Sequence, residues 1–157
     1  MTATIDRQRA ADFVDWFAEG WRAPTYESFC RHFGPRIAAD VRMAQPLQRP
    51  YTGYDEFLRS FATLFAIMPD VHARVLDWRG DERVVYIEFH LEGTVGGRPV
   101  RLEVCDRFTL DGETVEERHS FFDPAPLLGA FLRRPWALLR LVRLRSRARA
   151  LYETAPR

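Results

Sequence analysis

The sequence predicts an α+β fold, with helices first and a run of antiparallel strands after them. Apolar residues recur at helical spacing over residues 5–21 and 54–68, and Thr25 can cap a short helix that ends at Phe33. Four alternating segments joined by short turns follow, namely residues 71–79, 83–95, 98–110 and 114–122. Helices that precede consecutive strands favour an α+β fold over a doubly wound parallel sheet.

The segment between the second and third helices predicts one strand and one loop. Residues 37–44 have the composition of a short strand. Residues 45–50 contain two prolines and predict a loop before the helix that follows Gly53.

The C-terminal part of the sequence predicts a tail appended to a single domain. Pro135 can take the first position of a helix that runs to about residue 152, in which leucines alternate with arginines. We therefore expect residues 1–135 to form one α+β domain and residues 136–157 to form an arginine-rich helical tail of that domain.

Composition and charge exclude several classes of protein. The 157 residues suit one domain, and a formal net charge of +1 gives no bulk electrostatic attraction for nucleic acid. Two isolated cysteines, Cys30 and Cys105, are too few for a disulfide framework or a zinc site. The N-terminus does not read as a signal peptide, and no apolar run is long enough to span a bilayer. We expect a cytoplasmic protein with no metal and no cofactor.

The candidate site centres on a hairpin whose turn is Asp111-Gly112. Alternation places Asp106 on the apolar face of the first strand, and Arg118 should share that face across the turn. The apolar residues of this face are Val100, Leu102, Val104, Phe108 and Phe122. The pair is either an ion bridge that fixes the hairpin register or a polar handle at the floor of an apolar pocket. An arginine opposite Asp106 favours a base or an anion-binding arginine over a neutral acid donor.

The ordered motifs resemble the SnoaL-like group of the nuclear transport factor 2-like superfamily. The resemblance covers residues 8–135 and rests on the element order together with four short motifs. These are Gln45-Pro46-Leu47 before Tyr51-Thr52-Gly53, Gly93-Thr94 with Gly97-Arg98-Pro99, Asp106-Arg107-Phe108, and Phe122-Asp123-Pro124. The resemblance implies a cone-shaped domain in which N-terminal helices cover a curved antiparallel sheet around an internal pocket.

The catalytic groups of two relatives carry over to this chain only in part. The resemblance to ketosteroid isomerase implies an oxyanion donor at Asp106, but the general base falls near Met43 and the oxyanion tyrosine near Phe17. Neither side chain can move a proton, so steroid-type isomerisation is not expected. SnoaL-type cyclases pair this aspartate with a histidine, whereas His90 and His119 alternate onto the outer face.

The resemblance implies that a small, largely apolar organic molecule binds in the cone. The predicted pocket residues, which could equally form the core, are Phe17, Trp21, Met43, Phe57, Phe61, Phe65, Phe89, Leu91, Val104 and Phe122. Whether the protein is an enzyme stays open. It could act as an isomerase or cyclase through Asp106 with Arg118, or it could bind a ligand without turnover. A third alternative is a dimeric interaction module with a filled pocket.

Two further surfaces carry expectations about partners. The outer face of the sheet mixes Tyr86, Cys105 and Phe121 with alternating charges, which favours a solvated or dimer-facing surface over a metal site. Because members of the superfamily often pair through this face, the resemblance implies a homodimer. The tail should dock its apolar side through Trp136, Leu139 and Val142, with its arginine heads in water, rather than bind a membrane or nucleic acid.

Overall fold

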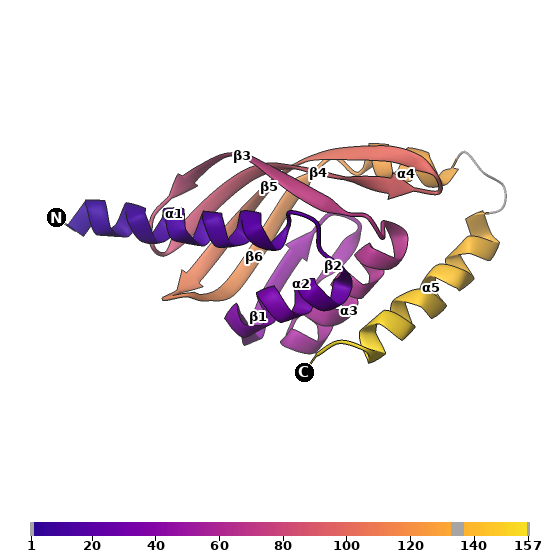
Figure 1. Cartoon of the computed structure of the whole chain (residues 1–157), viewed down its shortest axis with the longest axis horizontal. Coiled ribbons are helices and arrows are strands. Elements are labelled where there is room, and N and C mark those ends of the chain that lie inside the picture. Colours follow the sequence, from indigo (N-terminus) through magenta and orange to yellow (C-terminus); the bar gives the residue numbers. More distant parts are fainter. Residues whose placement is uncertain (1, 133–136, 157) are drawn as a thin grey trace.

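The computed structural model describes residues 2–132 and 137–156 and has an α+β architecture (Figure 1). The helices are α1 (Thr2–Gly20), α2 (Tyr26–Phe33), α3 (Tyr54–Ile67), α4 (Ala125–Leu132) and α5 (Ala137–Glu153), with a short 3₁₀ turn over Gly34–Arg36. The strands are β1 (Ile37–Gln45), β2 (Gln48–Thr52), β3 (His72–Gly80), β4 (Val84–Val95), β5 (Arg98–Asp111) and β6 (Thr114–Phe122). None of the described helices is long and apolar enough to cross a bilayer.

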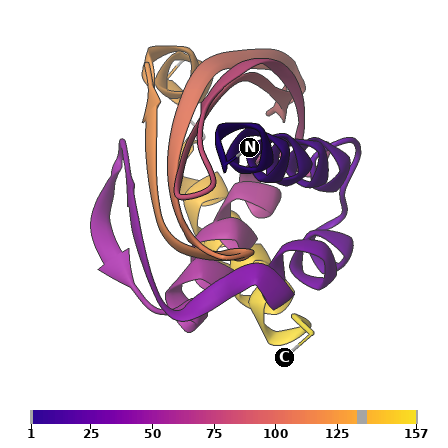
Figure 2. The same cartoon turned by 90° about the vertical axis from the view of Figure 1, so that its left-hand side faces the viewer.

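The strands form one mixed, curved sheet with the order β2-β1-β6-β5-β4-β3. The pairing of β1 with β6 is parallel and the other pairings are antiparallel. Figure 2 shows the sheet curling around α1, so that its concave face looks toward the helices. The α+β prediction and the four-strand meander β3 to β6 are therefore confirmed.

The predicted loop over residues 45–50 is wrong, because the chain makes a tight hairpin there. Strand β1 continues to Gln45, turns at Pro46 and Leu47, and returns as β2. Leu47 takes the left-handed conformation, with a φ of 66°, at a turn position where glycine is usual. Because the sequence has no glycine at this position, its residue types did not indicate a tight turn. Pro50 is compatible with β2 because β2 is the edge strand of the sheet, where the side away from β1 needs no N–H donor.

An aromatic cluster between the helices and the sheet forms the centre of the core. Phe29 of α2 lies 4.5 Å from Phe33, 4.5 Å from Phe61 and 4.9 Å from Trp21 between ring centroids. The start of α2 is fixed by Thr25, whose hydroxyl accepts from the backbone N–H of Ser28 at 3.1 Å while the Ser28 hydroxyl accepts from the backbone N–H of Thr25 at 3.0 Å. This reciprocal cap confirms the predicted start of the helix.

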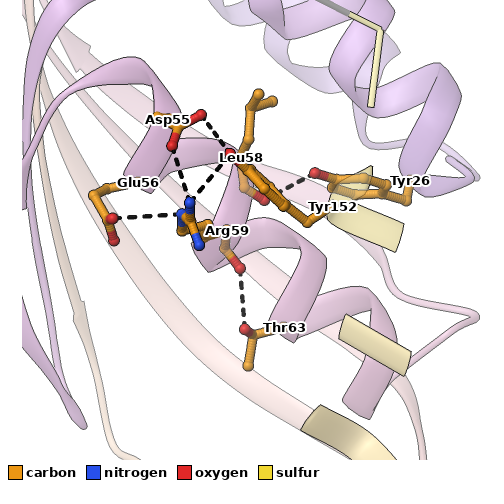
Figure 3. A network of polar contacts seen from close by, with 7 residues as sticks. All are labelled: Tyr26, Asp55, Glu56, Leu58, Arg59, Thr63 and Tyr152. Carbon is orange, nitrogen blue, oxygen red and sulfur yellow. Dashed lines mark hydrogen bonds and ion pairs between the residues drawn. The ribbon is translucent and has the colours of Figure 1, made fainter. Parts of the chain in front are cut away.

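Helix α5 packs along α3, and Figure 3 shows the polar contacts that hold its C-terminal end. The Tyr152 hydroxyl donates to Asp55 at 2.6 Å, and the Arg59 guanidinium lies 4.3 Å from the centre of the Tyr152 ring. Arg59 also pairs with Asp55 at 3.3 Å and with Glu56 at 3.6 Å. The tail is thus a docked helix, as expected. Of the predicted docking residues, Trp136 and the side chains of Leu139 and Val142 lie outside the described part of the structure.

Removing residues 136–157 should lower the melting temperature and increase the binding of an apolar dye. Leu151 and Tyr152 pack against the core, so truncation would expose the surface of α3 that they cover. Differential scanning fluorimetry measures both effects. A milder variant, Tyr152→Phe, keeps the ring over Arg59 and removes the hydroxyl that donates to Asp55 and accepts from Arg59, which should cost about 0.5–1.5 kcal/mol per hydrogen bond. A truncation that melts unchanged would show that the tail adds nothing to stability.

Candidate functional site

The candidate site is built around a buried ion pair on the concave face of the sheet. The Nε atom of Arg118 on β6 donates to Oδ2 of Asp106 on β5 at 2.6 Å, and its Nη1 donates to Oε1 of Gln45 at 3.2 Å. The Asp106 side chain is 1% exposed and the Arg118 side chain 12% exposed. The structure therefore brings together the two residues that the hairpin pattern placed on one face.

A β-bulge sets the alignment of this pair. Thr109 pairs with Glu117 and Leu110 pairs with Val115, so Glu116 is an extra residue on β6. The extra residue shifts β6 so that Ser120 stands opposite Asp106, and Arg118 reaches Asp106 diagonally across the two strands.

Several polar groups around the pair have no hydrogen-bond partner among the described residues. They are Oδ1 of Asp106, the hydroxyl of Ser120 and the hydroxyl of Tyr51, and all three atoms are buried. Burial raises the pKa of Tyr51, while the Arg118 charge offsets part of that rise. Buried polar groups normally have a hydrogen-bond partner, so these atoms can take part in binding a ligand.

A cavity of about 360 Å³ opens beside the Arg118 guanidinium. It lies among the β1–β2 turn, α3, strands β4 to β6 and α4, and its exposed lining residues are Leu47, Gln48 and Thr63. Its described lining residues are Trp21, Gln45, Pro46, Leu47, Gln48, Ser60, Phe61, Thr63, Leu64, Ile67, Phe89, Leu91, Leu102, Val104, Arg118, Ser120, Phe122 and Leu127. Most are apolar, and Arg118 is the charged residue among them. A filled cone, one of the sequence-based alternatives, does not agree with this cavity.

The structure divides the predicted pocket residues between the cavity wall and the core. Those that line the cavity are Trp21, Phe61, Phe89, Leu91, Val104 and Phe122. Phe17, Met43 and Phe57 instead border a small void of about 20 Å³ deeper in the molecule, and Phe65 belongs to the core. Asp106 is in neither lining set, because it sits behind Arg118 and Ser120.

Sequence reasoning missed part of the cavity wall, and for some of it a signal existed. Leu102 and Ser120 share the alternation of Val104 and Arg118, which places them on the same face. Ser60, Leu64 and Ile67 recur at helical spacing on α3. The remaining missed residues are Gln45, Pro46, Leu47, Gln48, Thr63 and Leu127. Four of these belong to the unpredicted hairpin.

Other reactive groups in the described part of the chain show no sign of a second catalytic centre. Burial raises the pKa of the Cys30 thiol to about 11 and also raises that of Cys105, so neither thiol is activated. Among the described residues, no three His, Cys, Asp or Glu side chains are grouped so that they could hold a metal ion.

Comparison with solved structures shows that the fold is that of nuclear transport factor 2-like proteins. A protein from Jannaschia sp. CCS1 assigned as a SnoaL-like polyketide cyclase is 18% identical, with a TM-score of 0.70 over 82% of this chain and 94% of that one. A hypothetical protein from Catenulispora acidiphila with a ketosteroid isomerase-like fold, solved with trimethylamine, is 18% identical, with a TM-score of 0.64 over 75% and 90% of the chains.

A third similar structure is an LEH-like epoxide hydrolase from M. tuberculosis. It is 16% identical, with a TM-score of 0.63 over 86% of this chain and 96% of that one. No curated protein sequence matches the chain. At these identities the solved structures establish the fold alone. The model of the SnoaL-like domain matches residues 13–117, which is most of the chain, and the chain belongs to the SnoaL-like domain family.

Proposed function

We propose that the protein binds a small, largely apolar organic molecule in the cavity beside Arg118. The observation that carries the proposal is the cavity itself. Its volume of about 360 Å³ lies within the usual range for small-molecule sites, and its wall is apolar except for a few convergent polar groups. The relatives named as a cyclase and an epoxide hydrolase act on small organic molecules, in line with this proposal.

Filling the cavity should abolish the binding of a neutral apolar probe. Leu64→Trp places a bulky indole ring at a half-buried position of the wall on α3. Leu76→Trp is the matched control, because Leu76 is exposed on β3 and is not part of the wall. We expect wild type and the control to bind aminoanthracene alike, by fluorescence titration, and Leu64→Trp to lose at least tenfold in affinity. Equal binding by all three proteins, or none by wild type, would contradict the proposal.

Catalysis of the isomerase or cyclase type is a second candidate, and Asp106 is the residue that could support it. Its Oδ1 atom has no hydrogen-bond partner among the described residues, and its two neighbours Arg118 and Ser120 line the cavity. Asp106 does not itself line the cavity, so as a general base it would have to act through these two neighbours. The test is a substrate screen with Asp106→Asn, which keeps the size of the side chain and removes the charge. Turnover that survives this change would exclude Asp106 as the base.

We also propose that two copies pair through the outer face of the sheet. Tyr86 and Phe121 are 43% and 48% exposed there, and the His119 ring stacks on Phe121 at 4.2 Å. Exposed aromatic residues among charges are typical of the surfaces that proteins bury on association. Light scattering at tens of micromolar should return the mass of a dimer, and Phe121→Glu should shift it to the monomer. A monomer mass for the wild-type protein would remove this proposal.

A further inference from the structure

The guanidinium of Arg118 is held at two of its three nitrogens, which leaves Nη2 for a ligand. Asp106 accepts from Nε and Gln45 accepts from Nη1, which fixes the plane of the group. The Phe61 ring lies 5.7 Å from its central carbon. An arginine carries five N–H donors, and Nη2 has no acceptor among the described residues. The N–H groups of Nη2 lie beside an apolar cavity and can donate to a hydrogen-bond acceptor of a ligand.

Ser120 offers a second donor on the same wall. It lies two residues after Arg118 on β6, so both side chains project from one face of the strand. The serine is 1% exposed, lines the cavity, and its hydroxyl has no partner among the described residues. One ligand oxygen placed between the two residues would satisfy both groups.

The amide acceptors of the wall are occupied, which bears on the polarity of the ligand. Oε1 of Gln45 already accepts from Arg118 at 3.2 Å. Oε1 of Gln48 accepts from Gln45 at 2.7 Å and from Ser60 at 2.9 Å. A ligand that donates hydrogen bonds would compete with these contacts, whereas a ligand that accepts them finds free donors.

The charge balance of the site favours a neutral hydrogen-bond acceptor over an anion as the ligand. Asp106 already neutralises Arg118, and no second cation belongs to the described wall. A carboxylate would bring an uncompensated negative charge close to the buried carboxylate of Asp106, which is unfavourable. A carbonyl oxygen accepts the same hydrogen bonds and leaves the charge balanced.

We infer that the ligand carries a neutral carbonyl group whose oxygen accepts hydrogen bonds from Arg118 and Ser120, with the apolar remainder of the molecule in the cavity. The inference rests on the proposed binding function and adds the chemical class of the ligand. It assigns Arg118 and Ser120 as the residues that determine specificity. Asp106 and Gln45 act as positioning residues that hold the guanidinium toward the cavity.

Three naphthalenes of matched shape test the inference by isothermal titration calorimetry. Acetylnaphthalene carries the neutral carbonyl, isopropenylnaphthalene replaces its oxygen by a methylene group, and naphthoate carries the anion, all at the same ring position. We expect wild type to bind the ketone at least tenfold more tightly than either of the others. Ser120→Ala should reduce the preference for the ketone over the alkene several-fold without weakening the alkene.

Two further variants separate recognition from folding. The double change Asp106→Leu with Arg118→Leu removes the guanidinium without stranding a charge, and it should erase the preference for the ketone. Arg107→Leu, on the outer face of β5, is the control and should keep the preference for the ketone. Equal binding of ketone and alkene by wild type would overturn the inference and leave the proposed function standing. Tightest binding of naphthoate would also overturn it. Failure of all three to bind would contradict the proposed function itself.

Discussion

Replacing Arg118 with leucine should lower the free energy of unfolding by about 3–5 kcal/mol, because it leaves a buried carboxylate without its partner. Asp106 is 1% exposed, and Arg118 is the ion-pair partner at 2.6 Å. Chemical denaturation at neutral pH measures the loss. The double change Asp106→Leu with Arg118→Leu should recover much of it, since apolar residues often replace a buried pair at little cost.

The matched control for this prediction is the neighbouring pair on the outer face. Arg107 and Glu117 lie 3.1 Å apart, and their side chains are 33% and 30% exposed. Arg107→Leu should cost no more than about 1 kcal/mol, because partly solvated ion pairs contribute little. If Arg118→Leu proved as mild as Arg107→Leu, the Asp106–Arg118 pair would not be a buried electrostatic unit.

Replacing Phe29 with alanine should destabilise the protein by about 3–5 kcal/mol, because it leaves a cavity in the aromatic cluster. Phe29 is 1% exposed and stacks within 6.0 Å of five other rings, those of Trp21, Phe33, Phe57, Phe61 and Phe65. Leu76→Ala, at a site on β3 that is 41% exposed and outside the proposed dimer surface, is the control and should cost far less. Urea denaturation compares the two variants.

The same variant tests the division between core and cavity wall. Phe29 contributes to the small inner void but not to the wall of the larger cavity. Phe29→Ala should therefore keep the affinity for aminoanthracene under conditions in which it stays folded. A large loss of probe binding in the folded variant would mean that the aromatic cluster takes part in the site.

The alternation of residues within each strand predicted which side chains face the cone. Asp106, Val104 and Leu102 lie on the concave face, as the period of two requires. The pairing across the hairpin was harder to predict. Unbroken pairing from the Asp111–Thr114 turn would place His119 opposite Asp106, and the extra residue Glu116 corrects the alignment. Bulges of this kind leave no clear mark in one sequence.

The alternation could not separate pocket from core. Phe17 and Phe57 are as apolar as Phe61 and Phe89, yet the first two pack against other rings deeper in the molecule while the second two border the cavity. Which part of an apolar face stays unfilled depends on how large side chains from different elements meet. The hairpin at Leu47 was missed for a local reason, since leucine rarely takes its left-handed conformation.

The two interpretations of the Asp106–Arg118 pair are compatible in this structure. The guanidinium binds Asp106 through Nε and Gln45 through Nη1, and Nη2 has no acceptor among the described residues. The pair can therefore stabilise the fold and present donors to a ligand. The double variant distinguishes these roles, because it should remain folded and yet lose the preference for a carbonyl.

A crystal structure of the wild-type protein soaked with acetylnaphthalene tests the central claim most directly. The claim predicts that the naphthalene rings lie in the cavity among Phe61, Phe89 and Leu102, with the carbonyl oxygen within hydrogen-bonding distance of Arg118 and Ser120. Rings bound elsewhere, or a carbonyl that points away from Arg118 toward the exposed residues Leu47 and Thr63, would contradict it.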